Sequence, residues 1–195
     1  AFGTQTAAMS VSGVRNPPAP SNTVTDTEEW NGSNWTSGGA VPSGRYSACF
    51  FGTQTAGVFA GGNPGPSNTG ATDSAEYNGS SFSAGNSMAN GRYNATSGGT
   101  LTAGLVVMGT AGGSDTANCE EYDGTNYSAG GTSVIADNDL GGSGTQTNFS
   151  AFIGPTAQTL IYDGTSWRTD VTGATALGNV AGTGTSSTTG IVASG

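Results

Sequence analysis

The sequence predicts an all-β fold built from several copies of one small antiparallel unit. Two short motifs each recur at intervals of 40–49 residues along the 195-residue chain, and such a period is typical of repeat architectures. Asn-Gly or Asp-Gly dipeptides recur between aromatic residues, which indicates β-hairpins. No window of 11 residues places apolar side chains at helical spacing. We therefore expect strands and turns throughout, with essentially no helix.

The first repeated motif is Gly-Thr-Gln-Thr or a close variant of it. It begins at Gly3, Gly52, Gly99 and Gly144, with a weaker copy at Gly184. In each full copy it separates two segments of apolar or small residues, and a glycine follows the second segment. This arrangement predicts that the motif is the turn of a first hairpin in each repeat.

The second motif is an acidic residue and an aromatic residue, followed by Asn-Gly or Asp-Gly and a second aromatic. Three copies begin at Glu29, Glu76 and Glu121, and a fourth begins at Ile161, where isoleucine replaces the acid. Asn-Gly and Asp-Gly favour a type I′ turn, because both of its central residues need positive φ. The aromatics that flank the turn, such as Trp30 and Trp35, should therefore pack together on adjacent strands.

Both motifs divide a single domain of residues 1–195 into repeats of about 1–40, 41–88, 89–132 and 133–170, with a partial fifth at 171–195. In the second repeat we expect strands near 45–51, 55–60, 71–77 and 81–85. A unit of this length with four antiparallel strands has the size of a propeller blade. The predicted fold class is thus a β-propeller or partial propeller with four full repeats. Three explanations for how the ring closes are compatible with the sequence. One blade is short, the chain belongs to a longer ring, or its ends pair with a neighbouring subunit.

Composition limits the functions that the chain can have. Leu, Ile, Val and Phe supply 27 of 195 residues, about 14 %, so any core must be thin and rich in small side chains. The chain has four Arg and no Lys or His against 13 acids, for a net charge of −9. Nucleic-acid binding needs many cationic contacts to phosphates, and spanning a bilayer needs a long apolar run. We therefore expect neither nucleic acid as a partner nor insertion into a membrane.

The residue types also argue against catalysis. Without His, nucleophile–His arrangements are excluded, and adjacent acids such as Glu120 and Glu121 point to opposite faces of a strand. The Asp123 and Asp163 turns lack the terminal bidentate acid of a calcium loop. We expect no enzyme activity, no cofactor and no metal. Cys49 and Cys119 are predicted to be buried thiols, with a disulfide as the alternative.

One set of charges recurs with the repeats and suggests ion pairs between them. Glu29, Glu76 and Glu121 precede the first aromatic of the second motif, and Arg45 and Arg92 recur 47 residues apart in Gly-Arg-Tyr. In the fourth repeat Ile161 replaces the acid, and Asp139-Leu140 stands where the arginine would be. Since both partners disappear together, we expect these acids and arginines to form structural ion pairs between blades.

The repeats resemble kelch-type repeats, with the pattern Gly-Thr-Gln-Thr-Ala, then Gly-Gly-Asn, then Glu-Trp-Asn-Gly-Ser-Asn-Trp. More closely, they look like the degenerate kelch-like repeats of virion structural and tail-fibre proteins of tailed phages, especially marine ones. The resemblance covers nearly the whole chain. It implies a non-enzymatic, extracellular part of the virion surface, involved in host attachment or structure, whose partners are other virion proteins or copies of itself. Kelch enzymes differ in having histidine and metal ligands, which this chain lacks.

Recognition would use loops carried by the sheets. The long loops at 14–22, 63–70 and 109–116 are the best candidates, with ligand contacts expected from Arg15, Asn16, Asn63 and Asn68. One alternative function is a propeller lectin that binds host-surface glycans on the repeated aromatic residues. Another is a filament subunit that assembles through incomplete terminal blades.

Overall fold

The computed structural model describes residues 2–15, 22–66, 68–138, 140–172, 176, 180–183 and 191–194. All regular elements within these ranges are β-strands, and every strand pair is antiparallel. The predicted all-β class is therefore confirmed for this part of the chain. No described segment is a helix long and apolar enough to cross a membrane.

Most strands belong to four four-stranded sheets, in which spatial order follows chain order. Sheet 1 contains β1 (Phe2–Gly3), β2 (Ala8–Val14), β3 (Thr23–Trp30) and β4 (Trp35–Ser37). Sheet 2 contains β5 (Cys49–Thr53), β6 (Ala56–Ala60), β7 (Ser74–Tyr77) and β8 (Phe82–Ala84). Sheet 3 contains β9 (Thr96–Thr100), β10 (Ala103–Val107), β13 (Asn118–Tyr122) and β14 (Tyr127–Thr132). Sheet 4 contains β15 (Leu140–Thr145), β16 (Asn148–Ile153), β17 (Gln158–Tyr162) and β18 (Trp167–Thr172).

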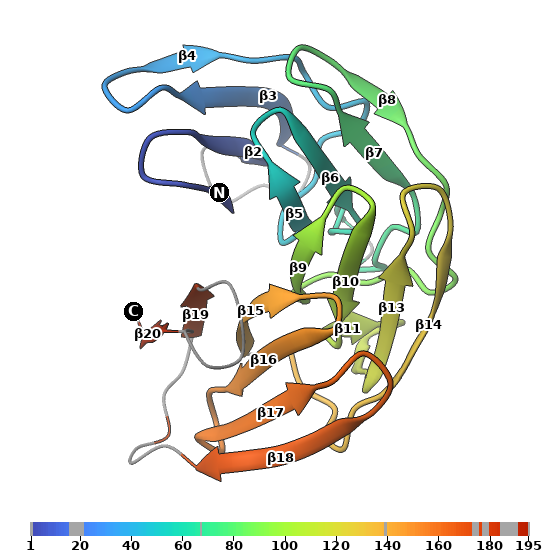
Figure 1. The fold of residues 1–195 in the computed structure, drawn as a ribbon. Coiled ribbons are helices and arrows are strands. Elements are labelled where there is room, and N and C mark those ends of the chain that lie inside the picture. Colours follow the sequence, from blue (N-terminus) through green and yellow to red (C-terminus); the bar gives the residue numbers. More distant parts are fainter. Residues whose placement is uncertain are drawn as a thin grey trace.

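The four sheets lie side by side along an open arc (Figure 1). Their first strands β5, β9 and β15 follow the inner side of the arc, and β4, β8, β14 and β18 follow its outer side. Two small hairpins complete the described strands: β11 (Thr110–Ala111) with β12 (Ser114–Asp115), and β19 (Val180–Thr183) with β20 (Ile191–Ser194). Strand β19 packs against β15, as β15 packs against β9 and β9 against β5. The described strands do not close a ring.

Apolar side chains fill the spaces between neighbouring sheets. Between sheets 1 and 2 the buried residues are Met9, Val11, Val41, Phe59 and Tyr77. Between sheets 2 and 3 they are Cys49, Phe51, Val58, Ala60, Met88, Val106 and Tyr122. Glycine allows this close packing, because a Cβ added to Gly104 would lie 2.1 Å from the Phe51 ring. The core is thin, as the composition predicts, and it consists of one layer for each pair of sheets.

Cys49 is buried between sheets 2 and 3, and Cys119 is buried between sheets 3 and 4. Both are free thiols, so this prediction is confirmed. Burial raises the pKa of Cys49 to about 12 and that of Cys119 to about 11. At neutral pH the two side chains are therefore protonated and behave as small apolar groups.

The Gly-Thr-Gln-Thr motif forms the predicted turn between the first two strands of a sheet. In sheet 4, Thr145 pairs with Asn148, so the loop between them holds two residues. Gly144 has φ of +137°, and an added Cβ would lie 2.2 Å from the carbonyl oxygen of Asn148. Only glycine fits this position, which explains why the motif keeps it in every copy.

The Asn-Gly and Asp-Gly turns form the second hairpin of each sheet, but not in the expected type I′ geometry. Trp30 pairs directly with Trp35, which leaves a four-residue loop, and within it only Gly32 has positive φ. The Asn31 side-chain oxygen accepts hydrogen bonds of 2.9 Å from the amides of Ser33 and Asn34. The side chain thus stabilises the turn, as Asn often does. The flanking rings pack as predicted, with centroids 5.5 Å apart for Trp30 and Trp35.

Candidate functional site

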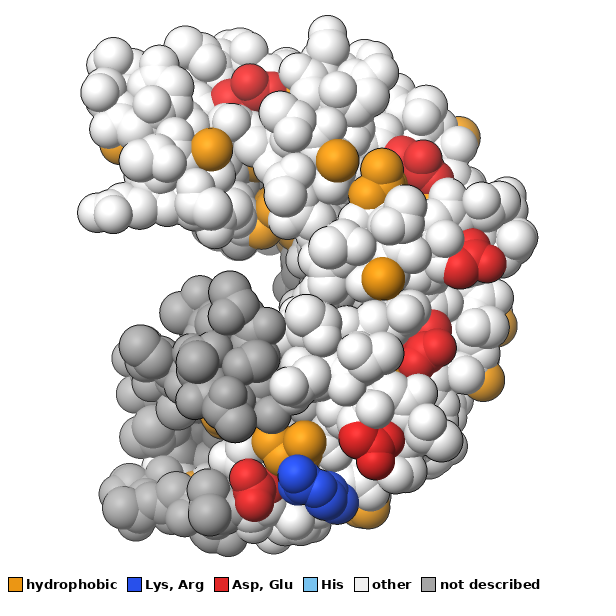
Figure 2. Space-filling view, viewed as in Figure 1, with side chains coloured by type: hydrophobic (Ala, Val, Ile, Leu, Met, Phe, Trp, Pro, Cys, Tyr) orange, Lys and Arg blue, Asp and Glu red, His pale blue; other side chains and the backbone are white. Residues whose placement is uncertain are grey.

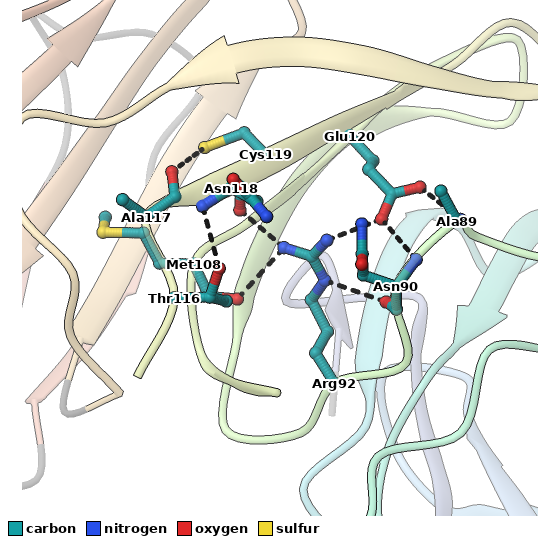
Figure 3. A network of polar contacts seen from close by, with 9 residues as sticks. All are labelled: Ala89, Asn90, Arg92, Met108, Thr116, Ala117, Asn118, Cys119 and Glu120. Atoms are coloured by element: carbon teal, nitrogen blue, oxygen red, sulfur yellow. Dashed lines mark hydrogen bonds and ion pairs between the residues drawn. The ribbon is translucent and has the colours of Figure 1, made fainter. Parts of the chain in front are cut away.

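Arg92 connects sheets 2 and 3. It lies in the segment 85–95 between them, and its side chain is completely buried. Its guanidinium donates to the Glu120 carboxylate at 2.5 Å and to the carbonyl of Asn118 at 2.5 Å, both in sheet 3 (Figure 3). Its own carbonyl accepts from the amide of Gly62, just after β6 of sheet 2. Glu120 also accepts from two backbone amides of the same segment, at Ala89 and Asn90.

Arg45 makes the equivalent connection between sheets 1 and 2. Its guanidinium forms an ion pair with Asp73 and donates to the carbonyl of Gly61 at 2.9 Å. The guanidinium carbon also lies 5.4 Å from the centre of the Phe59 ring, a favourable cation–π distance. On the side of sheet 1, the Ser12 hydroxyl exchanges hydrogen bonds of 2.7 Å with the backbone of Arg45.

The acids that pair with these arginines differ from those expected. Arg45 and Arg92 contact Asp73 and Glu120, and neither contacts Glu29, Glu76 or Glu121. The reason is strand alternation: Glu120 and Glu121 point to opposite faces of β13, and only Glu120 faces the segment that holds Arg92. Asp139, which stands at the arginine position of the fourth repeat, lies outside the described residues.

The three expected acids have a different repeated role. Each accepts a hydrogen bond from the tyrosine hydroxyl of the following sheet, which joins Tyr77 to Glu29, Tyr122 to Glu76, and Tyr162 to Glu121. Each tyrosine directly follows the acid of its own sheet, or Ile161 in sheet 4. In each such dipeptide the tyrosine bonds the preceding sheet and the acid bonds the following sheet. Glu76-Tyr77 of sheet 2, for example, connects sheets 1, 2 and 3.

These hydrogen bonds predict a loss of stability at alkaline pH. Burial, and then the hydrogen bond to Glu29, raises the pKa of Tyr77 to about 12. Burial and the equivalent hydrogen bonds to Glu76 and Glu121 raise the pKa of Tyr122 and of Tyr162. In the unfolded chain these phenols ionise near pH 10. Their contribution to stability should be complete below about pH 10 and should decrease as the pH rises toward about 12. Urea unfolding followed by circular dichroism between pH 8 and 12 measures this decrease.

The variant Tyr77→Phe provides the control. Its free energy of unfolding at pH 8 should fall by about 1 kcal/mol, the typical contribution of one hydrogen bond. Above about pH 10 it should lose less stability than the wild type, because one titrating group is gone. A triple variant with Phe at Tyr77, Tyr122 and Tyr162 that keeps the full alkaline loss would contradict this explanation.

Three of the four expected ligand contacts lie among the described residues, and they differ in exposure. Asn63 is completely buried and is therefore unavailable to a ligand. Its side chain accepts a hydrogen bond from the amide of Gly65 and donates one to the side chain of Asn68. It shapes its own loop, in which Asn68 is exposed. Asn16 lies outside the described residues. Arg15 is exposed and forms an ion pair with Asp26 of β3.

Arg15 also borders a cleft on the open face of sheet 1, which we call the sheet 1 cleft. Its volume is about 560 Å³, and its polar lining consists of Ser10, Ser12, Arg15, Asp26, Thr27, Glu28 and Ser37. Alternation along β2 creates this face, since Met9 and Val11 are buried toward sheet 2 while Ser10 points the other way. Asp26 and Glu28 were not among the expected site residues, although their alternating positions in Thr-Asp-Thr-Glu indicate one common face.

A second hollow of about 430 Å³ lies at the inner side of the arc. Its lining includes Phe2, Phe50 and glycines of β5, β9, β15 and β19, with no ionisable side chain. Among the described residues, no group of three or more His, Cys, Asp or Glu could hold a metal ion. The sheet 1 cleft, by contrast, is lined by three charged side chains, those of Arg15, Asp26 and Glu28.

Comparison with known proteins gives a likeness of fold alone. No protein-family model matches the chain, and no curated protein matches it. One similar solved structure, described as the structure of YjhT, has a TM-score of 0.53 at 14 % sequence identity. The match covers 64 % of this chain and 42 % of YjhT, so this chain spans less than half of that protein.

Proposed function

We propose that this chain is part of a β-propeller that acts as a non-catalytic structural and display module. The side-by-side antiparallel sheets support the propeller arrangement. The observation that carries the functional proposal is the use of ionisable residues between sheets: Arg45, Arg92, Glu29, Glu76, Glu120 and Glu121 all bond across or beside an inter-sheet space. Groups held this way make a rigid scaffold, on which loops and open faces can bind partners.

The setting that we propose is the surface or tail of a virion, outside the cell, with other virion proteins or further copies of the chain as partners. The kelch-like repeats support this setting through their resemblance to phage structural proteins. The exterior is compatible with display: on the face seen in Figure 2, acidic side chains are scattered among neutral polar ones. A net charge of −9 favours solubility in such a location.

A lectin function has less support. Glycan sites need exposed aromatic rings. Tyr77, Tyr122 and Tyr162 are at most 1 % exposed and lie between sheets, and although Trp35 is 47 % exposed, its counterpart Trp167 is buried, so the repeats do not each present a ring. A glycan array with the purified chain distinguishes the two functions. We expect no binding above background; micromolar binding with one glycan per repeat would favour the lectin instead.

Immunogold electron microscopy tests the virion setting directly. Antibodies against the purified chain should label the capsid or tail surface of intact phage particles that carry its gene. Labelling only of free protein in the lysate, with unlabelled intact particles, would contradict the proposal. Negative-stain images of the purified chain, taken alongside, should contain compact particles; extended filaments would favour a self-assembling subunit.

A further inference from the structure

We propose that the sheet 1 cleft binds an arginine side chain of a partner polypeptide, presented on a segment of the Gly-Arg-Tyr type. The inference goes beyond the structural role proposed above and does not depend on the virion setting. It rests on a comparison of the repeats, because sheets 2 and 3 each receive such an arginine at the positions that form this cleft in sheet 1.

The equivalent positions follow from the second motif. Asp26 lies three residues before Glu29, as Asp73 lies three residues before Glu76. Glu28 directly precedes Glu29, as Glu120 precedes Glu121. Asp73 binds Arg45, and Glu120 binds Arg92. Sheet 2 has only the first of these acids and sheet 3 only the second, whereas sheet 1 has both.

Backbone acceptors repeat in the same way. Arg45 donates to the carbonyls of Gly61 and Asp73, and Arg92 donates to those of Met108 and Asn118. The corresponding residues of sheet 1 are Ser12 and Asp26, which both line the cleft. Carboxylates and carbonyls arranged together suit a guanidinium, which presents five donors in one plane.

The acids of the cleft are accessible to a partner. Asp26 and Arg15 form a contact in which their side chains are 60 % and 71 % exposed, and such surface pairs are weak and exchangeable. Glu28 is exposed, and no ion pair of the described chain includes it. A second arginine can therefore bind Glu28 beside Arg15, or displace Arg15 from Asp26.

The character of this face distinguishes an arginine segment from other occupants. One position of the second strand of each sheet faces the preceding sheet. It is apolar in sheets 2, 3 and 4, where it holds Phe59, Val106 and Ala151. In sheet 1 the equivalent residue is Ser10. A hydroxyl therefore stands where the other sheets pack an apolar side chain against the preceding sheet. No aromatic ring lines the cleft, so it also lacks the platform that a glycan would need. Two exposed carboxylates on one strand favour a cationic group instead.

The test uses the chain's own arginine segment as the probe. A synthetic peptide with the sequence of residues 85–95, containing Arg92, is titrated at low salt into the ¹⁵N-labelled chain. We expect saturable NMR shifts at the amides of Ser10, Asp26 and Glu28, with a Kd on the order of 1 mM. The same peptide with Arg92→Ala should bind at least about tenfold more weakly, because the charge-assisted bonds are lost.

Variants of the chain locate the binding. Because both acids are exposed, the double change D26N with E28Q should leave the fold intact, which the spectrum verifies, and should abolish the shifts. The matched control D170N removes one charge on β18, far along the arc, and should bind the peptide like the wild type.

Three results would overturn the inference. The first is equal binding of the Arg92→Ala peptide, and the second is unchanged binding by the D26N/E28Q chain. The third is an absence of shifts together with self-association that Arg168→Ala abolishes, since that would assign the face to a second copy. Arg168 is exposed and has no ion pair within the described residues.

Discussion

Replacing Arg92 with alanine is expected to lower the free energy of unfolding by about 3–5 kcal/mol, which would make it one of the most damaging single changes in the chain. The substitution leaves the Glu120 carboxylate, whose side chain is 4 % exposed, without its cationic partner. It also removes the donor to the carbonyls of Asn118 and Met108. Urea unfolding measures the loss, and the melting temperature should fall by about 10 °C.

Two further variants show whether the unpaired charge is the cause. Adding Glu120→Gln to Arg92→Ala removes the buried charge and should recover part of the lost stability. Arg15→Ala breaks an exposed ion pair and should cost at most about 1 kcal/mol. If Arg92→Ala were as mild as Arg15→Ala, the buried ion pair would not be a major stabilising contact between sheets 2 and 3.

The second large effect is expected from Gly144→Ala in the first turn of sheet 4. At φ of +137° an alanine is strained, which costs on the order of 1–3 kcal/mol. Its Cβ would also lie 2.2 Å from the carbonyl oxygen of Asn148, so the two-residue hairpin must open. We expect a total loss above about 3 kcal/mol, measured by urea unfolding.

Gly13→Ala separates strain from collision. Gly13 has φ of +132°, close to that of Gly144, but an added Cβ would have no atom within 4 Å. Its loss should stay within the about 1–3 kcal/mol of backbone strain alone. Equal losses for the two variants would mean that the collision with Asn148 relaxes without cost.

Much of the fold follows from local signals. The turns at Gly144 and Asn31 and the pairing of Trp30 with Trp35 depend on residues within a few positions of one another, and the sequence predicts all three. The type I′ assignment was wrong because the Asn31 side chain stabilises a longer loop through its own hydrogen bonds. Such a bond within a loop is not visible in a dipeptide pattern.

The candidate site was harder to predict. A repeated acid and a repeated arginine suggested partners, but Glu120 and Glu121 both recur beside the motif, and only the facing direction of β13 selects Glu120. Asn63 stands in a loop rich in Gly and Pro and suggested a surface contact, yet its side chain closes that loop from within. Loop composition therefore did not indicate burial.

By itself, the sequence determined the repeat, its strands and turns, the thin core and the absence of histidine chemistry, because these depend on residue types and on spacing along the chain. Only the tertiary structure decided which acid meets which arginine, which tyrosine reaches which glutamate, and which face of sheet 1 stays open. Those outcomes depend on how one sheet is placed against the next. That placement is set by contacts between residues about 30–50 positions apart, which no local pattern encodes.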